Sequence, residues 1–280
     1  MIAQPTLFDL DFCQRWRSRV PSWRHTSEGG FNPRAYAVAR IDEEAARGFV
    51  VRHHYSRSYP AASLRFGLFE RGHLVGVAVL GVPMSRAVLA GPFPTLEPYR
   101  QSLELSRLIL LDEVPANAES WFVSRVFADA AGAGVRGVVA FSDPLPRRVS
   151  GDVLMPGHIG TVYKALNGIY TGRGTARTLT LLPDGRVFSA RARAKVTGDE
   201  RGSSHVRAGL VTLGAPHPEP SEPAGAWLTR ALVTVGAHTV RHPGNHRYVW
   251  TIGDRSARRS TPIALPSLPY PTTIDTGAAR

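Results

Sequence analysis

Four short segments of the sequence hold the side chains that can take part in catalysis or binding. They are His53-His54-Tyr55-Ser56, Glu104-Leu105-Ser106-Arg107-Leu108, the stretch 141–163 and the turn 241–248. In the third segment an apolar run ends in Ser142 and Asp143, and a helix is expected to begin at Gly160. Polar groups at the carboxyl end of a strand, beside a helix N-terminus, are a usual place for chemistry in α/β sheets, so we expect a site there.

Three residues of this third segment have side chains suited to proton transfer or ligand binding. Asp143 can accept a hydrogen bond from an amine or a ring N–H, and His158 can act as an acid, a base or a metal ligand. Tyr163 is either a general acid or a half-buried core residue of a short helix. The turn with Gly157 and Gly160 is a candidate for holding a donor or a phosphate group.

Glu104 lies inside an otherwise apolar run, 103–111, which predicts a strand. Strict alternation places Glu104, Ser106 and Leu108 on one face of that strand and Arg107 on the other. A carboxylate inside such a strand is costly unless it is paired or functional. Glu104 is either half of a buried Glu–Arg pair or a base, metal ligand or substrate ligand, and we favour a functional role.

Two adjacent histidines end the first predicted helix, 42–54. The negative end of the helix dipole also favours histidines there, which is the structural alternative. Since His53 and His54 cannot both face one ligand, at most one of them is catalytic. The basic turn 241–248 also has two interpretations, a solvated hairpin entry or a contact to phosphates and bases, and its charge favours the contact.

The spacing of apolar residues predicts the elements that must hold these side chains. Strands are expected over 35–41, 64–70, 74–82, 103–111, 138–141 and 246–252, with one or two more over 169–182, and helices over 42–54, 118–131, 160–167 and 226–235. Asp42 is expected to cap the first helix and Asn167-Gly168 to end the third. This order predicts a mixed α/β sheet rather than a doubly wound parallel one.

The composition is that of a globular protein. The chain has 280 residues, 43% of them hydrophobic, and has no apolar run long enough for a transmembrane helix. We expect no secretory leader and no membrane partner. The single cysteine, Cys13, excludes an internal disulfide and a cysteine-rich zinc site, so a cytoplasmic location is expected.

The formal net charge of +12 favours a polyanionic partner, most simply nucleic acid. The surplus lies in the second half of the chain. Residues 1–140 hold 16 basic and 13 acidic side chains, whereas residues 141–280 hold 18 and 9. Arginine accounts for 32 of the 34 basic residues, a skew typical of GC-rich coding sequences, so the distribution is more informative than the count.

These patterns predict four parts: an N-terminal arm over 1–34, a catalytic core over 35–190, an extension over 191–253 that contacts DNA, and a disordered basic tail over 254–280. Without a clear period, the arm interleaves arginines with tryptophans: Arg15, Arg17, Arg19, Arg24, Trp16 and Trp23. It is either a solvated segment or an arm in which arginine contacts phosphate and tryptophan stacks on bases, and we favour the solvated segment.

In their order and spacing, these motifs resemble the phage Mom family of DNA modification proteins over 35–182. The residues that carry the resemblance are His54-Tyr55-Ser56, the hairpin 66–77, Glu104-Leu105-Ser106-Arg107-Leu108, 120–125, Phe141-Ser142-Asp143, 157–163 and Tyr170-Thr171-Gly172, and 244–248 is also similar. The resemblance implies a GNAT-like acyltransferase fold, with a mixed, mostly antiparallel central sheet flanked by helices and here a basic C-terminal extension. It further implies that the protein forms a carbamoylmethyl group on N6 of adenine in double-stranded DNA, which protects phage DNA from restriction in the host cytoplasm.

The resemblance also implies roles for individual residues. The catalytic set is His54, Tyr55, Ser56, Glu104, Ser106, Asp143, His158 and Tyr163. Glu104 or Asp143 would hold or deprotonate the amine, the histidines and Tyr55 would act as acids, bases or ligands, and the serines would orient the substrate. The donor would be held by Gly157, Gly160 and Ser120. DNA would be contacted by Arg107, Lys164, Arg173, Arg241, His246 and Arg247, with the target base flipped out of the duplex.

One segment departs from ordinary GNAT enzymes, in which a glycine-containing loop after the central strand holds the pyrophosphate of coenzyme A. Here the link 111–117 has no glycine and carries Asp112 and Glu113, which would repel phosphates. An acyl-CoA-like donor therefore lacks its usual loop. A metal-assisted chemistry would use His54, Glu104 and His158 as ligands. The identities of the donor and of any metal stay open, as does the oligomeric state.

Two other functions stay open alongside DNA modification. One is a GNAT-type N-acyltransferase that acts on a small amine or a protein, with the positive charge incidental. The other is a non-catalytic DNA-binding protein on the same scaffold. Tight, salt-sensitive binding to duplex DNA argues against the first, and a modified base argues against the second.

Overall fold

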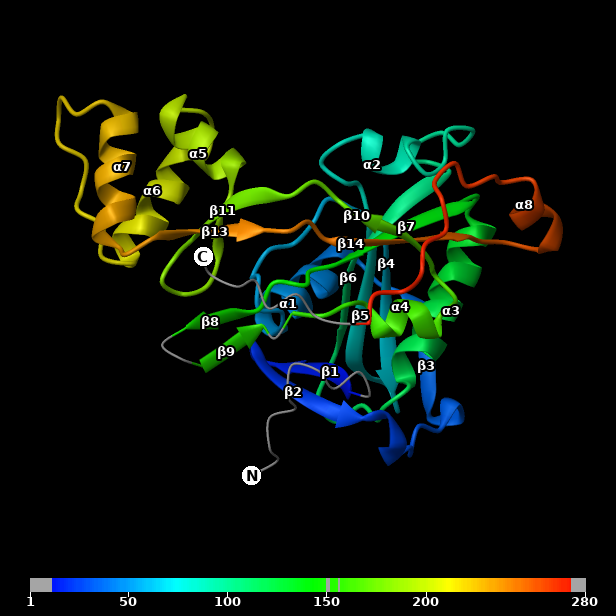
Figure 1. The fold of residues 1–280 in the computed structure, drawn as a ribbon. Helices are drawn as coiled ribbons and strands as arrows, with labels where there is room; N and C mark the ends of the chain where they lie inside the picture. The colour runs from blue at the N-terminus through cyan, green and yellow to red at the C-terminus, as the bar shows by residue number, and fades with distance from the viewer. Residues whose placement is uncertain (1–11, 150–151, 156, 273–280) are drawn as a thin grey trace. The chain divides into compact units, whose positions relative to one another are not determined.

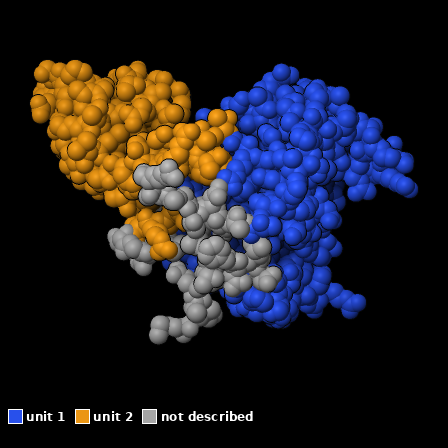
Figure 2. Space-filling view, in the orientation of Figure 1, with its two compact units in different colours: residues 1–145, 155–174, 245–276 blue, residues 146–154, 175–244, 277–280 orange. Residues whose placement is uncertain are grey.

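The computed structural model describes residues 12–149, 152–155 and 157–272. The chain forms two compact units (Figure 2): the first comprises residues 1–145, 155–174 and 245–276, and the second residues 146–154, 175–244 and 277–280. Compared with the predicted core over 35–190, the first unit begins earlier and gains a late segment that follows the second unit. In the described part of the chain, no helix is long and apolar enough to cross a membrane.

A seven-stranded sheet forms the centre of the first unit (Figure 1), in the order β10-β14-β7-β6-β5-β4-β3. Its strands are β3 (Tyr36–Arg40), β4 (Ala62–Glu70), β5 (His73–Gly81), β6 (Ser102–Leu110), β7 (Gly137–Ser142), β10 (Ile169–Arg173) and β14 (His246–Thr251). All neighbouring strands are antiparallel except β6 and β7, which are parallel. The predicted mixed, mostly antiparallel sheet flanked by helices is therefore confirmed.

Helices cover both faces of this sheet: α1 (Glu43–His53), α2 (Ala87–Ala90), α3 (Ala118–Gly132) and α4 (Thr161–Ala165), with two short 3₁₀ turns, η1 (Thr26–Glu28) and η2 (Pro33–Ala35), before β3. Because successive side chains of a strand point to opposite faces, Val139 of β7 joins the apolar cluster of α2 and Val138 joins that of α3. The side chain of Asp42 accepts a hydrogen bond from Ala45 N–H at 2.7 Å, which confirms the predicted cap of α1.

The single parallel pair of strands is short. β6 and β7 pair only from Ser102 opposite Gly137 to Leu105 opposite Ala140. Beyond this point β6 continues to Leu110 and β7 to Ser142 without further pairs between them, so the two strands part. The gap that opens between them is the place where polar side chains of both strands meet.

The N-terminal arm folds into a hairpin of β1 (Phe12–Arg17) and β2 (Val20–His25). Arg15 in β1 is fully buried, and its guanidinium donates to both carboxylate oxygens of Glu119 in α3. The same guanidinium donates to Val114 O at 2.8 Å and to Pro115 O at 2.6 Å. The expectation of a solvated arm is wrong for this hairpin, because the buried ion pair fixes β1 on the link between β6 and α3. The first eleven residues of the predicted arm lie outside the described residues.

Two more arginines of the hairpin bind the same link. Arg17 forms ion pairs with both carboxylates of the link, with Asp112 at 2.5 Å and with Glu113. Arg24 donates twice to Asp112 O, at 3.0 and 2.7 Å. The acidic link therefore binds three cations of the chain itself.

The second unit has a sheet and a core of its own. Its sheet has the order β12-β11-β13, and its elements are β11 (Arg177–Leu181), β12 (Val187–Phe188), β13 (His238–His242), α5 (Ala190–Thr197), α6 (Ser203–Thr212) and α7 (Ala224–Thr234). A further two-stranded ribbon pairs β8 (Arg147–Val149) with β9 (Asp152–Met155). The sequence predicted α7 but not α5 or α6. α5 buries only Val196 and α6 only Ser203 and Leu210, which is too little for a periodic apolar stripe.

The described part of the predicted disordered tail follows a fixed course along the first unit. It contains α8 (Arg255–Arg259), whose first turn is capped by the side chain of Asp254. Further on, the Tyr270 hydroxyl donates to Gly168 O at 2.9 Å. The bond from Tyr270 to Gly168 spans 102 residues of chain and leaves no trace in a basic, proline-rich composition, so the sequence predicted disorder. The last part of the tail, 273–280, lies outside the described residues.

Removing one partner of the buried Arg15–Glu119 pair is expected to destabilise the first unit strongly. Arg15→Met leaves the Glu119 carboxylate buried without its cation, a change that typically costs about 3–5 kcal/mol. Urea unfolding followed by tryptophan fluorescence measures this free energy. The matched control is Arg40→Met, because Arg40 pairs with Asp129 at the exposed surface, where such pairs are worth about 0–1 kcal/mol. Equal losses in the two variants would contradict the role of Arg15.

Candidate active site

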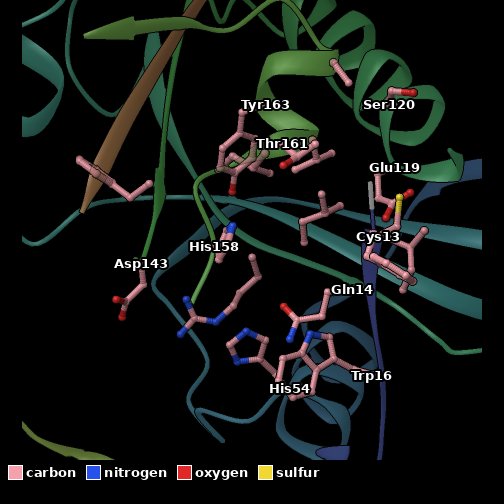
Figure 3. A pocket seen from close by; sticks show the side chains of 18 of the residues that line it. Cys13, Gln14, Trp16, His54, Glu119, Ser120, Asp143, His158, Thr161 and Tyr163 are labelled. Carbon is pink, nitrogen blue, oxygen red and sulfur yellow. The ribbon is translucent and has the colours of Figure 1, made fainter. Parts of the chain in front are cut away.

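A cavity of about 360 Å³ lies in the first unit, beside the parting strands β6 and β7 (Figure 3). Its wall includes most of the predicted catalytic residues: His54, Tyr55, Glu104, Ser106, Asp143, His158 and Tyr163. Two residues predicted for binding, Ser120 and Arg107, also line it. The volume lies in the range of small-molecule sites, roughly 300–1,000 Å³. Seven of the eight residues that the resemblance implied as catalytic therefore line one cavity.

An irregularity in β6 decides the directions of Glu104 and Arg107. Val79 of β5 pairs with Arg107, and the next residue, Leu80, pairs with Leu105. Ser106 has no partner in β5 and is the extra residue of a β-bulge. The bulge places Glu104 and Arg107 on the same face of the sheet. The prediction from strict alternation, which separated them, is wrong because a bulge reverses the parity of the strand.

Burial controls the charges of these two side chains. The Glu104 carboxyl is largely removed from water, which raises its pKa, and the charge of Arg107 opposes the rise. Burial likewise lowers the pKa of the Arg107 guanidinium. A carboxylate whose pKa is raised is a stronger base when it is ionised, so Glu104 is suited to accepting a proton from an amine.

His54 is oriented by the turn that follows α1. Ser56 N–H donates to Nδ1 of His54 at 3.2 Å, and the Ser56 hydroxyl lies 2.7 Å from the same nitrogen. Because Nδ1 accepts the backbone N–H, the neutral ring carries its proton on Nε2. Arg107 donates to Ser56 Oγ at 3.4 Å and to Ser58 Oγ at 3.0 Å. Ser56, which is not part of the cavity wall, and Arg107 thus position the His54 turn.

His158 and Asp143 are linked through the backbone, since His158 N–H donates to Asp143 O at 2.9 Å. The Asp143 carboxylate accepts from Leu145 N–H at 2.9 Å, and Figure 3 shows it turned away from the His158 ring. Burial lowers the pKa of His158, and the charge of Asp143 opposes this shift. His158 is therefore neutral near pH 7, with one nitrogen that can accept a hydrogen bond and one that can donate.

Tyr163 is a core residue and also lines the cavity, so the two locations that the sequence left open for it do not exclude each other. Its ring packs against Tyr248 and Trp250, with centroid distances of 5.3 and 5.6 Å, and it lines the cavity. Burial raises the pKa of its hydroxyl, so Tyr163 stays protonated and serves as a hydrogen-bond donor.

The glycines before α4 have a conformational role. Gly160 has a φ of 83°, and a Cβ there would lie 2.7 Å from the Tyr248 ring. Neither Gly157 nor Gly160 is part of the cavity wall, and α4 has only five residues. Gly160 allows the chain to turn against Tyr248, and the structure gives no support to the predicted role of either glycine in holding the donor.

The residues predicted to contact DNA have different environments. His246 is fully buried in β14, where its Nδ1 lies 2.9 Å from the Tyr170 hydroxyl, so the predicted DNA contact of His246 is wrong. It is buried because β14 pairs with a strand on each side. Arg247 is half-buried and donates to Thr171 Oγ1 at 2.9 Å. The exposed residues, for which DNA contact stays a prediction, are Lys164, Arg173 and Arg241.

The described residues do not fit either cofactor that the sequence suggested. In this part of the chain, no three His, Cys, Asp or Glu side chains form a group that could hold a metal ion, so His54, Glu104 and His158 are not a metal site. A coenzyme A pyrophosphate does not fit the link between β6 and α3. Its carboxylates and carbonyls bind the arginines of the hairpin, and the Glu119 carboxylate lies in the first turn of α3.

The sequence analysis missed the part of the wall that β1 supplies. Phe12, Cys13, Gln14 and Trp16 line the cavity, together with Glu119. No period in the sequence marks these residues, since the consecutive residues Phe12, Cys13 and Gln14 all line the cavity. Burial and the nearby Glu119 raise the pKa of Cys13 to about 11, so its thiol stays protonated and weakly nucleophilic at neutral pH.

The lowered pKa of His158 predicts a pH dependence of stability. The folded protein binds this proton less readily than the unfolded chain, so the contribution is complete above the ordinary histidine value of about 6.5 and is lost as the pH falls through the folded pKa. NMR titration of the His158 ring is expected to give a midpoint below about 6.5. His158→Gln should lose less stability than the wild type on acidification, and a midpoint above the ordinary value would contradict the burial argument.

Residues 35–272 match the family model of the Mom protein family. No curated protein matches the chain. Solved structures similar to it include a GNAT family acetyltransferase from Elizabethkingia anophelis with acetyl-CoA bound (7% identity, 78% of this chain and 99% of that chain, TM-score 0.33). Others are an N-acetyltransferase from Staphylococcus aureus Mu50 (16% identity, 52% and 87%, TM-score 0.32) and a tandem GNAT protein from the clavulanic acid biosynthesis pathway (10% identity, 78% and 75%, TM-score 0.35). These scores are too low to carry a conclusion, whereas the family match spans most of the chain, which therefore belongs to the Mom protein family.

Proposed function

We propose that the protein is a transferase that modifies the N6 amine of adenine in DNA with a carbamoylmethyl-type group. Membership of the Mom family supports this function. The observation that carries it is the Glu104 carboxyl, with its raised pKa, in a cavity that also holds His54, His158 and Tyr163. This set supplies a base, a neutral imidazole and a hydroxyl donor within one small space.

The chemistry demands such a base. The lone pair of the exocyclic N6 amine is delocalised into the purine ring, which makes the nitrogen a poor nucleophile. When ionised Glu104 accepts an N6 proton as the new bond forms, the electron density stays on nitrogen and the attack becomes easier. Burial of Glu104 strengthens this base, because it raises the affinity of the carboxylate for a proton.

In the transfer step, N6 attacks the reactive carbon of an activated carbamoylmethyl donor. The N6–C bond forms, the bond from that carbon to its leaving group breaks with its electron pair going to the leaving group, and one N6 proton passes to Glu104. The Tyr163 hydroxyl, which stays protonated, donates a hydrogen bond to the carbonyl oxygen of the transferred group. His54 and neutral His158 orient the amine and the donor.

The proposal requires DNA as the partner, and the charge of the second unit favours it. Residues 175–244 hold nine arginines and lysines against five aspartates and glutamates. Several of the arginines are paired with carboxylates, among them Arg230 with Glu222 at 2.5 Å. Arg177, Arg201 and Arg241 are exposed and can bind phosphates.

The modified base itself is the direct test. Cells that express the wild-type protein are expected to contain an adenine nucleoside with added mass, found by mass spectrometry of digested DNA. Glu104→Gln removes the base with little change of shape and should lower the yield about 10²- to 10⁴-fold. The control Glu97→Gln makes the same change at an exposed position and should leave the yield unchanged.

The outcomes separate the competing functions. Unmodified adenine in the presence of soluble wild-type protein would contradict the proposal and leave an acyltransferase of small amines or proteins, or a DNA-binding protein. Full activity of Glu104→Gln would remove Glu104 from the mechanism while keeping the reaction.

DNA binding by the second unit is expected to depend steeply on salt, because phosphate contacts release counterions. Arg241→Gln should weaken binding to all duplex sequences alike and reduce the slope of log K against log salt by about one. The control Arg230→Gln removes an arginine that is already paired with Glu222 and should change the slope less. Fluorescence anisotropy of a labelled duplex measures both, and identical slopes in Arg241→Gln and the wild type would argue against a phosphate contact there.

A further inference from the structure

Among the cavity-lining side chains of the described residues, three buried polar atoms have no hydrogen-bond partner. Two are donors, Nε2 of Gln14 in β1 and Nε of Arg107 in β6, and one is an acceptor, Oδ1 of Asn245 just before β14. Leaving such an atom without a partner typically costs about 1–3 kcal/mol. A ligand that fills the cavity is therefore expected to bring an acceptor to Gln14 and a donor to Asn245.

Gln14 is held in place by the strand that carries it. Alternation along β1 directs Arg15 to Glu119 and directs Gln14 and Trp16 to the opposite side. The Arg15 ion pair anchors the backbone of β1, so the amide of Gln14 enters the cavity on a fixed support. Figure 3 shows this amide beside the rings of Trp16 and His54.

Three aromatic rings form the wall next to Gln14. The rings of His54 and Tyr55 are 4.3 Å apart, and Trp16 lies 5.8 and 5.3 Å from them, measured between centroids. Rings of this kind stack on the face of a planar heterocycle, and stacking of a nucleobase is worth about 1–3 kcal/mol. Enzymes that act on a base take it out of the duplex and hold it in just such surroundings.

We propose that Gln14 recognises the flipped adenine, an inference that rests on the proposed modification of adenine. A glutamine amide has a donor and an acceptor side by side, and adenine presents the N6 amine beside a ring nitrogen, N7 or N1. Nε2 of Gln14 donates to that ring nitrogen, and its Oε1 accepts one N6 hydrogen. The second N6 hydrogen is left for Glu104.

This arrangement makes Gln14 a specificity residue, because it reads the edge of the base and takes no proton. It also supplies an acceptor for Nε2 of Gln14, which has no hydrogen-bond partner among the described residues. Oδ1 of Asn245 has no hydrogen-bond donor among the described residues, and the carboxamide NH₂ of the transferred group can supply one.

The binding of adenine analogues tests the contact between Gln14 and the base, and this measurement does not need the carbamoylmethyl donor. The probes are single-stranded thymine oligonucleotides that carry one central adenine, 7-deazaadenine or 1-deazaadenine, with affinities measured by fluorescence anisotropy. One of the two analogues is expected to bind the wild-type protein about 5- to 150-fold more weakly than adenine, which is the usual worth of a bidentate amide contact, about 1–3 kcal/mol. In Gln14→Leu this difference should vanish, since the partner of the ring nitrogen is gone.

Two further variants make the result decisive. Gln14→Glu keeps the shape and loses the donor, so it should also lose discrimination against the analogue, even where Gln14→Leu fails to fold. Gln101→Leu makes the same chemical change outside the cavity, where Gln101 accepts from Glu97 N–H at 2.9 Å, and should discriminate like the wild type. Discrimination that persists in both Gln14 variants, or that neither analogue shows in the wild type, overturns the proposal.

Failure of the inference and failure of the proposed function give different results. If Gln14 does not contact the base, the wild type still modifies cellular adenine, but the Gln14 variants and the wild type have the same relative affinities for adenine and its analogues. If the protein does not modify adenine, the nucleoside digest shows no added mass whatever the analogues show.

Discussion

The site exists because two parallel strands share only four residue pairs and then part. A sheet is stabilised by continuous pairing, so a gap inside one exposes backbone groups and must be supported from outside. Here α3 and α4 pack Phe127 and Tyr163 against Trp250, and β1 covers the link that follows β6. The parted strands deliver Glu104 and Arg107 from one side and Asp143 from the other.

The support of this gap is electrostatic as much as apolar. The link after β6 carries two carboxylates, and α3 adds a third in its first turn. Arg15, Arg17 and Arg24 of one hairpin bind all of them or the carbonyls beside them. The position at which many nucleotide-binding folds hold a phosphate is thus occupied by charges of the protein itself, which gives this end of the cavity a fixed shape.

Much of the first unit follows from the sequence, because its strands and helices are long and periodic. The strands at 35–41, 64–70, 74–82 and 103–111 and the Asp42 cap were all predictable from apolar spacing and one side chain. The strands and the cap depend on local chemistry, which the sequence states directly. The grouping of His54, Glu104 and His158 in one cavity was expected only from the resemblance to the Mom family.

The remainder depends on long-range contacts. The bulge at Ser106 arises from pairing with β5, and nothing in the residues around it distinguishes a bulge from regular alternation. Gln14 becomes part of the site because the neighbouring Arg15 forms an ion pair with Glu119, which lies 104 residues later in the chain. The burial of His246 likewise requires β14 to insert between β7 and β10, although its local sequence is that of a basic, exposed turn.

The place of the second unit in the chain has a consequence for how the strands of the first unit are connected. Its main segment, 175–244, leaves the first unit after Gly174 and returns at Asn245, and these two residues are joined by a backbone hydrogen bond of 2.8 Å. A short turn could span the same two points and leave β10 and β14 paired as a simple hairpin. Exchange or loss of the segment 175–244 would therefore leave the strands that carry the reacting groups connected as they are.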